Sequence, residues 1–383
     1  MKKLIYIVNG RIPTEKANGY QISKMCQEFA SAGLAVELWL PTRKNPITDN
    51  LFEFYGLPKN FTCRYLDCPD FIVYKKYLGK FCFWLQALVF LITLAGQKID
   101  RQTIIFSRQP EIVWLFASRG YQTIYEAHKW PQSKAGWHHR LVRRAAKILV
   151  LTQKLKELFV QAGFSEEKLA IMPDAVDLEV FNLNLTKEQA RIKLALSQNK
   201  TILLYTGSLT TMGQDKGLND ILKSLALLKQ NNDSLLFVAV GGSDKEIKRY
   251  DQLAQELKVE GLVDWQPRTK PAQVAVWQKA ADVLLMPFPF SEHYAYYMSP
   301  LKMFEYMASG RPIVASNLPS IREALNETNA VLVKPDDPVD LAAGINKLLN
   351  SQEIGEKLVQ QALKDVDNYT WAKRAAKIVN FIK

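Results

Sequence analysis

The chain of 383 residues has few cysteines and few histidines, four of each. Four cysteines in a chain of this length do not make a disulfide framework. Cys63 and Cys68 lie close together, but no second pair or nearby histidine completes a zinc site. Met1-Lys2-Lys3 leads directly into an apolar run, so we expect no signal peptide and a cytoplasmic protein with reduced thiols.

The chain also lacks an apolar run long enough to cross a bilayer. Its most hydrophobic segment, Phe81–Ala95, has about fifteen residues where a membrane span needs about 20, and Gln86 interrupts it. Two interpretations remain open, a buried core helix and an amphipathic helix in a membrane interface. The lysines before the segment and its aromatic residues favour peripheral membrane contact through Lys75–Ala95, which would place the protein at the inner face of the cell membrane.

Charge and length limit the remaining classes. The net charge is +12, and residues 1–180 carry 25 Lys and Arg against 16 Asp and Glu, so an anionic partner is expected. Nucleic acid is not favoured as this partner, because aromatic and basic residues do not alternate as in base-stacking surfaces. The length predicts two domains, each with its own core.

The first half reads as an alternation of strands and helices. Apolar runs predict strands over residues 4–8, 36–40, 103–106, 123–125, 147–151 and 169–172. A helix over about 21–32 separates the first two, which is the βαβ pattern of a parallel sheet. Ligands of such sheets bind beyond the carboxyl ends of the strands, so the loop Asn9–Tyr20 is a candidate binding loop.

Histidines follow one of these strands. His128 lies directly after the strand at 123–125, where a parallel sheet places active-site groups, and its ordinary pKa suits proton or hydrogen-bond chemistry. A purely structural role is the alternative for a single histidine. His138 and His139 precede a run of arginines and are expected on a solvated basic helix face.

A polar linker at about 177–200 leads to a second series of strands, predicted at 201–206, 235–240, 283–286, 313–315 and 330–333. Glycines stand where the first two of these strands end, in Gly207-Ser208 and Gly241-Gly242. Lys216-Gly217 at the next helix start resembles an anion site, with unpaired N–H groups and a flexible cation. The convergence of these turns indicates one ligand crevice.

The stretch Tyr296–Ser316 is the most informative. Ser299 is a suitable N-cap, Pro300 suits the first helical position, and a helix is predicted from Lys302 to Ser309. Its first N–H groups together with Lys302 would hold a phosphate, and Glu305 would accept hydrogen bonds from a ribose. The alternative is an ordinary capped surface helix with a Lys–Glu pair.

These motifs together resemble the retaining family 4 glycosyltransferases of the GT-B fold, over nearly the whole chain. The motifs that carry the resemblance are GS…KG (207–217), VGG (240–242), AADVLLMP (280–287), SPLKMFEYMASGRPIVAS (299–316), IMPDAVDLEVF (171–181) and YEAH (125–128). The resemblance implies an α/β fold of two Rossmann-like domains facing across a cleft, residues 1–180 on the acceptor side and 181–366 for the nucleotide sugar. Residues 367–383 form an amphipathic helix, expected to pack back on the N-terminal domain.

The resemblance also assigns roles to residues. The positions it implies for the donor are Gly207, Ser208, Lys216, Gly242, Arg268, Met298, Ser299, Pro300, Leu301, Lys302 and Glu305. Lys216 would contact the diphosphate, Glu305 the ribose, and Arg268 the base. His128 would lie beside the transferred sugar, and Gly19 and Tyr20 near the acceptor.

Two positions depart from the family pattern. Tyr297 stands where the family often has a second glutamate, eight residues before Glu305. Ser208 stands where many members have arginine, and Lys302 is placed to replace that charge.

The expected reaction is transfer of a sugar from a nucleoside diphosphate sugar to a glycan or lipid-linked acceptor with retention of configuration. Neither a cofactor nor a metal is expected, because fixed N–H groups with Lys216 and Lys302 would stabilise the departing diphosphate and no Asp-x-Asp lies in a suitable loop. The alternative is a non-catalytic nucleotide-sugar-binding or scaffold protein; an epimerase or phosphorylase is less favoured. The sequence leaves open which sugar, base and acceptor are used.

Overall fold

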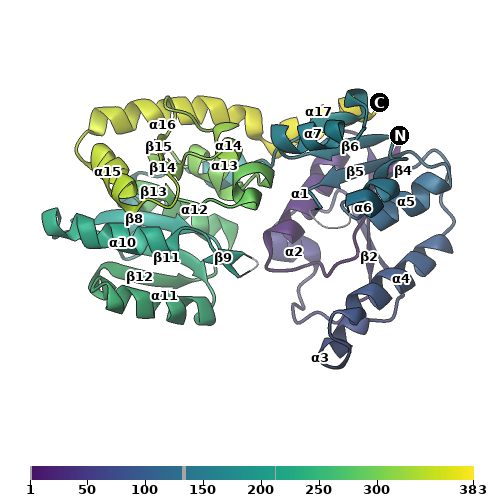
Figure 1. The fold of residues 1–383 in the computed structure, drawn as a ribbon, viewed down its shortest axis with the longest axis horizontal. Helices are drawn as coiled ribbons and strands as arrows, with labels where there is room; N and C mark the ends of the chain where they lie inside the picture. Colours follow the sequence, from purple (N-terminus) through teal and green to yellow (C-terminus); the bar gives the residue numbers. More distant parts are fainter. Residues whose placement is uncertain (1, 132–134, 212) are drawn as a thin grey trace. The chain divides into compact units, whose positions relative to one another are not determined.

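The computed structural model describes residues 2–131, 135–211 and 213–383. The chain divides into two compact units, one of residues 1–173 with 371–383 and one of residues 174–370. Both are parallel α/β sheets with helices on their two faces (Figure 1). This is the architecture of two Rossmann-like domains that the sequence predicts.

The first unit is built on a seven-stranded parallel sheet. In spatial order its strands are β3 (Thr62–Leu66), β2 (Ala35–Pro41), β1 (Lys3–Ile7), β4 (Ile104–Ser107), β5 (Thr123–Ala127), β6 (Lys147–Val150) and β7 (Leu169–Ile171). Its helices are α1 (Ala17–Ser31), α2 (Leu51–Tyr55), α3 (Lys75–Leu78), α4 (Phe81–Ala95), α5 (Pro110–Ser118), α6 (Ala135–Val142), α7 (Gln153–Gln161) and α17 (Trp371–Ile382), with short 3-10 turns at Phe71–Tyr74 and Glu166–Lys168.

The second unit is built on a six-stranded parallel sheet. In spatial order its strands are β12 (Val263–Pro267), β11 (Leu235–Gly242), β8 (Thr201–Thr206), β13 (Val283–Met286), β14 (Ile313–Ser316) and β15 (Val331–Val333), and β9 (Thr210–Thr211) pairs with β10 (Gln214–Asp215) in a small hairpin. Its helices are α8 (Leu178–Phe181), α9 (Lys187–Lys193), α10 (Leu218–Leu228), α11 (Asp244–Glu256), α12 (Pro271–Ala280), α13 (Leu301–Ala308), α14 (Pro319–Arg322), α15 (Pro338–Leu349) and α16 (Gln352–Val366). Shorter helical turns cover Lys229–Asn231, Glu260–Leu262, His293–Tyr297 and Asp367–Tyr369.

Chain order reverses once in each sheet. In the first unit the reversal lies between β1 and β4, and in the second between β8 and β13. The crevice at the carboxyl ends of such neighbouring strands is where open α/β sheets bind ligands. The sheets therefore place candidate sites beyond Ile7 and Ser107 in one unit and beyond Thr206 and Met286 in the other.

The cores follow from the apolar runs of the sequence. Leu4, Ile5 and Ile7 of β1 have no solvent exposure, and the same holds for Leu203 and Leu204 of β8. Strands that are covered on both faces need apolar side chains at every position, which is why they read as continuous runs.

Helix α17 belongs to the first unit, although it is last in the chain. It packs against α1, and its buried face carries the side chains of Trp371, Ala375, Ile378 and Ile382. The spacing of three or four residues between these side chains is the amphipathic pattern visible in the sequence.

The histidines of α6 do not lie on a solvated basic face, as the sequence suggests. His138 is half-buried, and its Nε2 lies 2.9 Å from the hydroxyl of Tyr125. His139 packs against the rings of Trp130 and Phe164. Burial, together with the positive charges of His139 and Lys129, lowers the pKa of His138 to about 4.

Candidate functional site

The carboxyl end of β8 supplies the first part of the site in the second unit. Gly207 follows the strand with φ of +108°, a conformation that favours glycine. The space beside its Cα is taken by the side chain of Lys302, whose Cε would lie 3.6 Å from a Cβ atom at this position. Gly207 therefore lets the chain turn while a cation lies next to the backbone.

Lys302 is the most unusual side chain of this region. The residue is 7% exposed, and its Nζ has no hydrogen-bond partner among the described residues. Its ammonium lies 3.4 Å from the ring centroid of Tyr205 and 5.4 Å from that of Phe288. Burial and the nearby charge of Lys216 hold the pKa of Lys302 well below its usual range.

Lys216 brings a second cation to the same place. Its Nζ donates to Oγ of Ser208 at 3.2 Å and lies 5.9 Å from the ring centroid of Phe288. Burial lowers the pKa of Lys216 to about 8; the carboxylate of Glu246 opposes the shift and Arg268 adds to it. Lys216 is half-buried, and its charge lowers the proton affinity of the buried Lys302, so the two cations together favour the binding of an anion.

Glu305 lies one turn along the helix from these cations. Its Oε2 accepts a hydrogen bond of 3.3 Å from Nε2 of Gln278, which donates also to Thr206. Burial raises the pKa of Glu305 to about 7, against the effects of Gln278 and Lys302. The carboxylate is thus positioned by α12 and is able to accept further hydrogen bonds.

The start of α13 differs from the sequence prediction. Pro300 is the N-cap and the helix runs from Leu301 to Ala308, so Ser299 is not the capping residue. The Oγ of Ser299 instead accepts a hydrogen bond of 2.9 Å from the backbone N–H of Asp174. The prediction was wrong because this hydroxyl finds a partner that is distant in sequence. The helix is also mostly buried, which contradicts the alternative of an ordinary surface helix.

The start of α10 also differs. The sequence suggests an anion site at Lys216-Gly217, but the carboxylate of Asp215 accepts hydrogen bonds from the N–H groups of Gly217 at 2.8 Å and Leu218 at 3.2 Å. These N–H groups are already paired, so only the Lys216 side chain serves an anion here. Gly217 has φ of +97°, and a Cβ atom on it would lie 1.9 Å from the carbonyl oxygen of Pro287.

The remaining positions assigned to the donor lie around these groups. Gly242 ends β11, where a Cβ atom would approach Ile247 to 2.8 Å and Leu209 to 2.9 Å, so close packing accounts for this glycine. Arg268 is exposed just after β12. Met298 is buried, directly before the start of α13.

Tyr297, at the position where the family often has glutamate, is 5% exposed, and its hydroxyl donates to Oε1 of Glu292. Burial and this carboxylate raise the pKa of the Tyr297 phenol. A carboxylate is therefore present near this position, although it comes from a different residue. Sequence reasoning missed Glu292, because no motif distinguishes it from other acidic residues.

In the first unit the central group is Glu126 of β5. Its side chain has no solvent exposure and accepts hydrogen bonds from Nε of Arg108 at 2.7 Å, from the Tyr6 hydroxyl at 3.0 Å and from Nη2 of Arg374. Burial raises the pKa of Glu126, but Arg108, Arg374 and His128 outweigh it and hold the pKa well below its usual range. This network was not predicted, because its residues come from four distant segments.

His128 follows β5 directly, as the sequence predicts. Its Nε2 lies 3.5 Å from Oε2 of Glu126, and about a quarter of its side chain is exposed. The ring is thus next to a buried carboxylate that is itself fixed by two guanidinium groups. Such an arrangement orients a histidine for hydrogen bonding to a ligand at the carboxyl edge of the sheet.

Gly19 and Tyr20 do not lie in a loop. Helix α1 begins at Ala17, so both are in its first turn. A Cβ atom on Gly19 would lie 2.1 Å from the Tyr55 hydroxyl, and that hydroxyl donates to the carbonyl of Thr14. Gly19 thus permits close packing between α1 and α2.

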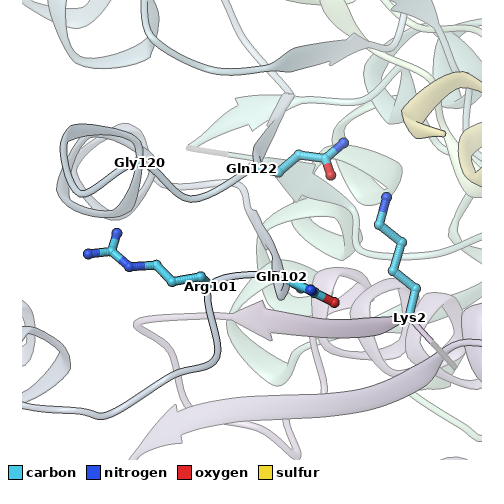
Figure 2. Close-up of a pocket in the computed structure, with 5 residues that line it drawn as sticks. All are labelled: Lys2, Arg101, Gln102, Gly120 and Gln122. Carbon is cyan, nitrogen blue, oxygen red and sulfur yellow. The ribbon is translucent and has the colours of Figure 1, made fainter.

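A hollow of about 590 Å³ lies at the opposite edge of the first sheet (Figure 2). The residues that line it are Lys2, Arg101, Gln102, Gly120 and Gln122. They lie just before the amino ends of β1, β4 and β5. The amide of Gln122 already donates to the carbonyl of Ile382 at 2.7 Å. The hollow is thus far along the strands from His128 and is not a part of the site described above.

Over the described residues, no helix combines the length and apolarity that a membrane span needs. Within the same residues, His, Cys, Asp and Glu side chains form no group of three or more that could hold a metal ion.

The sequence of the second unit is similar to that of known glycosyltransferases. Residues 186–365 match the sequence model of the family described as "Glycosyl transferases group 1". An uncharacterised glycosyltransferase of Methanocaldococcus jannaschii is 23% identical over 245 residues, and a D-inositol 3-phosphate glycosyltransferase of Thermomonospora curvata is 28% identical over 246 residues. These matches cover 62% and 61% of this chain, and 60% and 54% of the two relatives.

Solved structures match over the whole chain. Sucrose-phosphate synthase from Thermosynechococcus elongatus has a TM-score of 0.78 at 17% identity, covering 99% of this chain and 98% of the other. Anabaena HepE in complex with UDP has a TM-score of 0.71 at 16% identity, covering 99% of each chain. At such identities the likeness establishes the fold.

The two Rossmann-like units have the GT-B fold, which the solved structures share. Within the chain, residues 186–365 are similar to the family described as glycosyl transferases group 1.

Proposed function

We propose that the chain transfers a sugar from a nucleoside diphosphate sugar to a glycan or lipid-linked acceptor, with retention of configuration and without a metal ion. The second unit binds the donor, and the first unit binds the acceptor. The observation that carries this proposal is the buried Nζ of Lys302, which has no hydrogen-bond partner among the described residues and lies near a second, half-buried cation, Lys216. The UDP complex of Anabaena HepE, a protein of the same fold, supports a nucleotide donor.

The donor contacts follow from the chemistry of the groups. Lys216 and Lys302 bind the diphosphate, and the N–H groups at Leu301 and Lys302 add a partial positive charge. Glu305 accepts hydrogen bonds from the ribose hydroxyls, and Arg268 lies toward the base. Ser299 and Pro300 fix the entry into α13 and do not contact the phosphate through their side chains.

The bond between the sugar C1 and the donor phosphate oxygen breaks, and a bond from the acceptor oxygen to C1 forms on the same face. The acceptor proton passes to the departing phosphate oxygen. The two ammonium groups stabilise the negative charge that develops on this diphosphate, which is the largest catalytic effect expected of such a site. His128, oriented by Glu126, donates a hydrogen bond to the transferred sugar, and Gly19 and Tyr20 lie on the acceptor side.

Thermal-shift measurements with UDP-, GDP- and ADP-sugars identify the base, and calorimetry then gives the affinity. Replacement of Glu305 by Ala should weaken binding of the nucleotide by about tenfold, because buried hydrogen bonds to a charged group are lost. Unchanged affinity would remove Glu305 from the ribose site.

Replacement of His128 by Ala should slow turnover more than it weakens donor binding, and normal turnover would contradict its role.

A second candidate is a non-catalytic nucleotide-sugar-binding or scaffold protein. The observation that favours it is Tyr297, which is bonded to Glu292 where the family often has glutamate. Donor hydrolysis or transfer by the purified protein distinguishes the two functions, because the scaffold would bind the donor and leave it intact.

A further inference from the structure

The first unit exposes an unusual number of large apolar side chains on α3 and α4. More than half of the exposed large apolar side chains of the described residues fall between residues 73 and 92. They are Val73, Tyr74, Tyr77, Leu78, Phe81, Phe83, Trp84, Leu88 and Ile92, here called the α3–α4 patch. Figure 1 shows α3 and the adjoining end of α4 at one extremity of this unit.

Helix α4 is apolar on two opposite sides, and only one of them is buried. The buried side carries Cys82, Gln86, Phe90 and Leu94. On it the Gln86 Oε1 accepts a hydrogen bond of 2.8 Å from the N–H of Phe71. The packing of the first unit thus accounts for the buried side, including the polar residue Gln86.

The exposed side of α4 forms a straight stripe. Phe81, Trp84, Leu88 and Ile92 are 61%, 64%, 55% and 63% exposed, and they recur every three or four residues. Tyr77 of α3 is 82% exposed just ahead of this stripe. Soluble proteins rarely expose a continuous apolar surface of this kind unless it binds something.

The charge at one end of the stripe has a single sign. Lys75, Lys76 and Lys80 are exposed, and no acidic residue occurs between residues 71 and 99. An apolar stripe with aromatic residues and a basic end is the pattern of a helix that lies in the headgroup region of an anionic membrane.

The topology places this basic end at the functional edge of the first sheet. Strand β3 ends at Leu66 and β4 begins at Ile104, so α4 runs back from the carboxyl edge of the parallel sheet to its amino edge. The lysines precede α4 and therefore lie toward the carboxyl edge, which is also the edge that His128 follows.

We propose that the α3–α4 patch binds the surface of an anionic lipid bilayer, with its aromatic and aliphatic side chains in the interface and Lys75, Lys76 and Lys80 at the lipid phosphates. This contact brings the carboxyl edge of the first unit to the membrane, where a lipid-linked acceptor is held. The membrane contact extends the proposed function, and only the statement about the acceptor rests on that function. Binding to the bilayer itself needs neither donor nor acceptor.

A second copy of the chain is a poorer occupant. In a symmetric dimer the same patch faces itself, so the partner would bring no acidic side chain from residues 71–99 to these lysines. An anionic bilayer supplies both the apolar layer and the negative charge.

The test is co-sedimentation of the full chain with vesicles of phosphatidylcholine alone and with vesicles that also contain phosphatidylglycerol. We expect binding to the second kind and at least about tenfold weaker binding to the first, because the attraction of three lysines to anionic lipid is lost. No binding to either kind would overturn the proposal, whatever the transferase assays show.

Two sets of variants locate the contact. W84S/L88S/I92S should weaken vesicle binding about a hundredfold, because three exposed apolar groups leave the interface. The matched control W114S/L227S/I192S changes the same residue types at exposed positions outside the patch and should bind normally. K75Q/K76Q/K80Q should abolish the preference for phosphatidylglycerol, whereas K59Q/K98Q/K168Q should keep it.

Equal binding by the patch variant and its control would overturn the proposal, provided that circular dichroism shows both to be folded.

Analytical ultracentrifugation adds one more outcome. If the wild-type chain dimerises, fails to bind vesicles, and loses dimerisation in W84S/L88S/I92S, the patch is an interface between copies and the membrane proposal is wrong. If vesicles bind but donor affinity is absent, the proposed function fails and the membrane contact stands.

Discussion

At the scale of single residues, Lys302 and Lys216 show a conflict between stability and binding. The buried ammonium of Lys302 has no hydrogen-bond partner in the described residues, and the rings of Tyr205 and Phe288 replace only part of its lost hydration, while the charge of Lys216 adds repulsion. The protein retains both, and an arriving diphosphate relieves both costs. Such unfavourable groups are typical of binding sites, because they favour the ligand over the empty state.

Replacement of Lys302 by Met should therefore stabilise the second unit while it weakens donor binding. We expect the free energy of unfolding to rise by about 1–2 kcal/mol, as for other buried charges replaced by apolar groups. Donor affinity should fall by about tenfold to a hundredfold, since a charge-assisted contact is lost. Urea denaturation and calorimetry measure the two effects. Lys223→Met, at an exposed position of α10, is the control and should change neither; a destabilised Lys302→Met would contradict the account.

Donor affinity should also depend on pH with a maximum between about 7 and 8. Lys216, with its pKa lowered to about 8, loses its charge above that pH, so affinity falls there by up to about tenfold per pH unit. Glu305, with its pKa raised to about 7, becomes protonated below that pH and is a poorer acceptor for ribose hydroxyls. Calorimetry with a nucleoside diphosphate sugar, whose diphosphate does not titrate in this range, measures both limbs. Glu305→Gln should remove only the acidic limb, and a flat profile in the wild type would contradict both assignments.

The sequence could identify these residues only in part. Lys216, Lys302 and Glu305 stand in local motifs, so spacing was enough to select them. Asp215, Glu126 and Arg374 could not be selected in this way. Their partners are brought together by the fold, as when Arg374 reaches Glu126 across 248 positions.

At the scale of elements, α17 is held to the first sheet by one buried charge network. Arg374 donates to Glu126 of β5 and, through its Nε, to the carbonyl of Pro173 at 2.8 Å. This side chain thus fixes α17 at the carboxyl ends of the strands, next to the carboxylate that orients His128.

Arg374→Met should destabilise the first unit by about 3–5 kcal/mol, because it leaves part of a buried charge network uncompensated. It should also slow turnover more than it changes donor affinity, since Glu126 loses one of the groups that position it. Lys377→Met, at an exposed position of the same helix, serves as the matched control and should have neither effect. Equal unfolding midpoints for the two variants in urea would show that the network does not hold α17.

The apolar runs predicted most strands, but not β3 and β12. These strands lie at the edges of their sheets, and their sequences mix polar and apolar residues, as in Thr62–Leu66. An edge strand is covered incompletely, so it needs no continuous apolar run. Helix boundaries moved by a few residues, because contacts that the sequence does not reveal decide whether a residue such as Ser299 caps a helix.

At the scale of the whole molecule, two buried groups act on the free energy of unfolding in opposite directions as pH falls. Glu305, with its pKa raised to about 7, is protonated in the folded chain before it is protonated in the unfolded chain, so it favours folding as pH falls from 7 to about 4.5. His138 has the opposite effect. Above its ordinary value of 6.5, His138 is neutral in both folded and unfolded chains. Below it, the unfolded chain gains a proton that the folded chain accepts only near pH 4, so stability falls between these values. The low pKa of Glu126 adds a loss at still lower pH, and the net charge of +12 grows as carboxylates are protonated.

The contributions of His138 and Glu305 should therefore largely offset each other between pH 6.5 and about 4.5, and the free energy of unfolding should fall steeply only below that range. Urea denaturation at a series of pH values measures this dependence. His138→Phe should gain stability as pH falls from 6.5 to about 4.5, because the contribution of Glu305 is then unopposed, while the loss at lower pH remains. An unchanged slope in the variant would show that His138 is not the group responsible.

The membership of α17 in the first unit has a consequence for synthesis on the ribosome. Residues 174–370 contain all of the second unit, so that unit can fold as soon as they emerge. The first unit is started earlier and finished later, because Trp371 and Arg374 arrive only with the last residues. A nascent chain that stops before residue 371 leaves Glu126 without one of its cations and leaves part of α1 uncovered. Interrupted translation therefore yields a product in which the first unit is incomplete, although its synthesis began first.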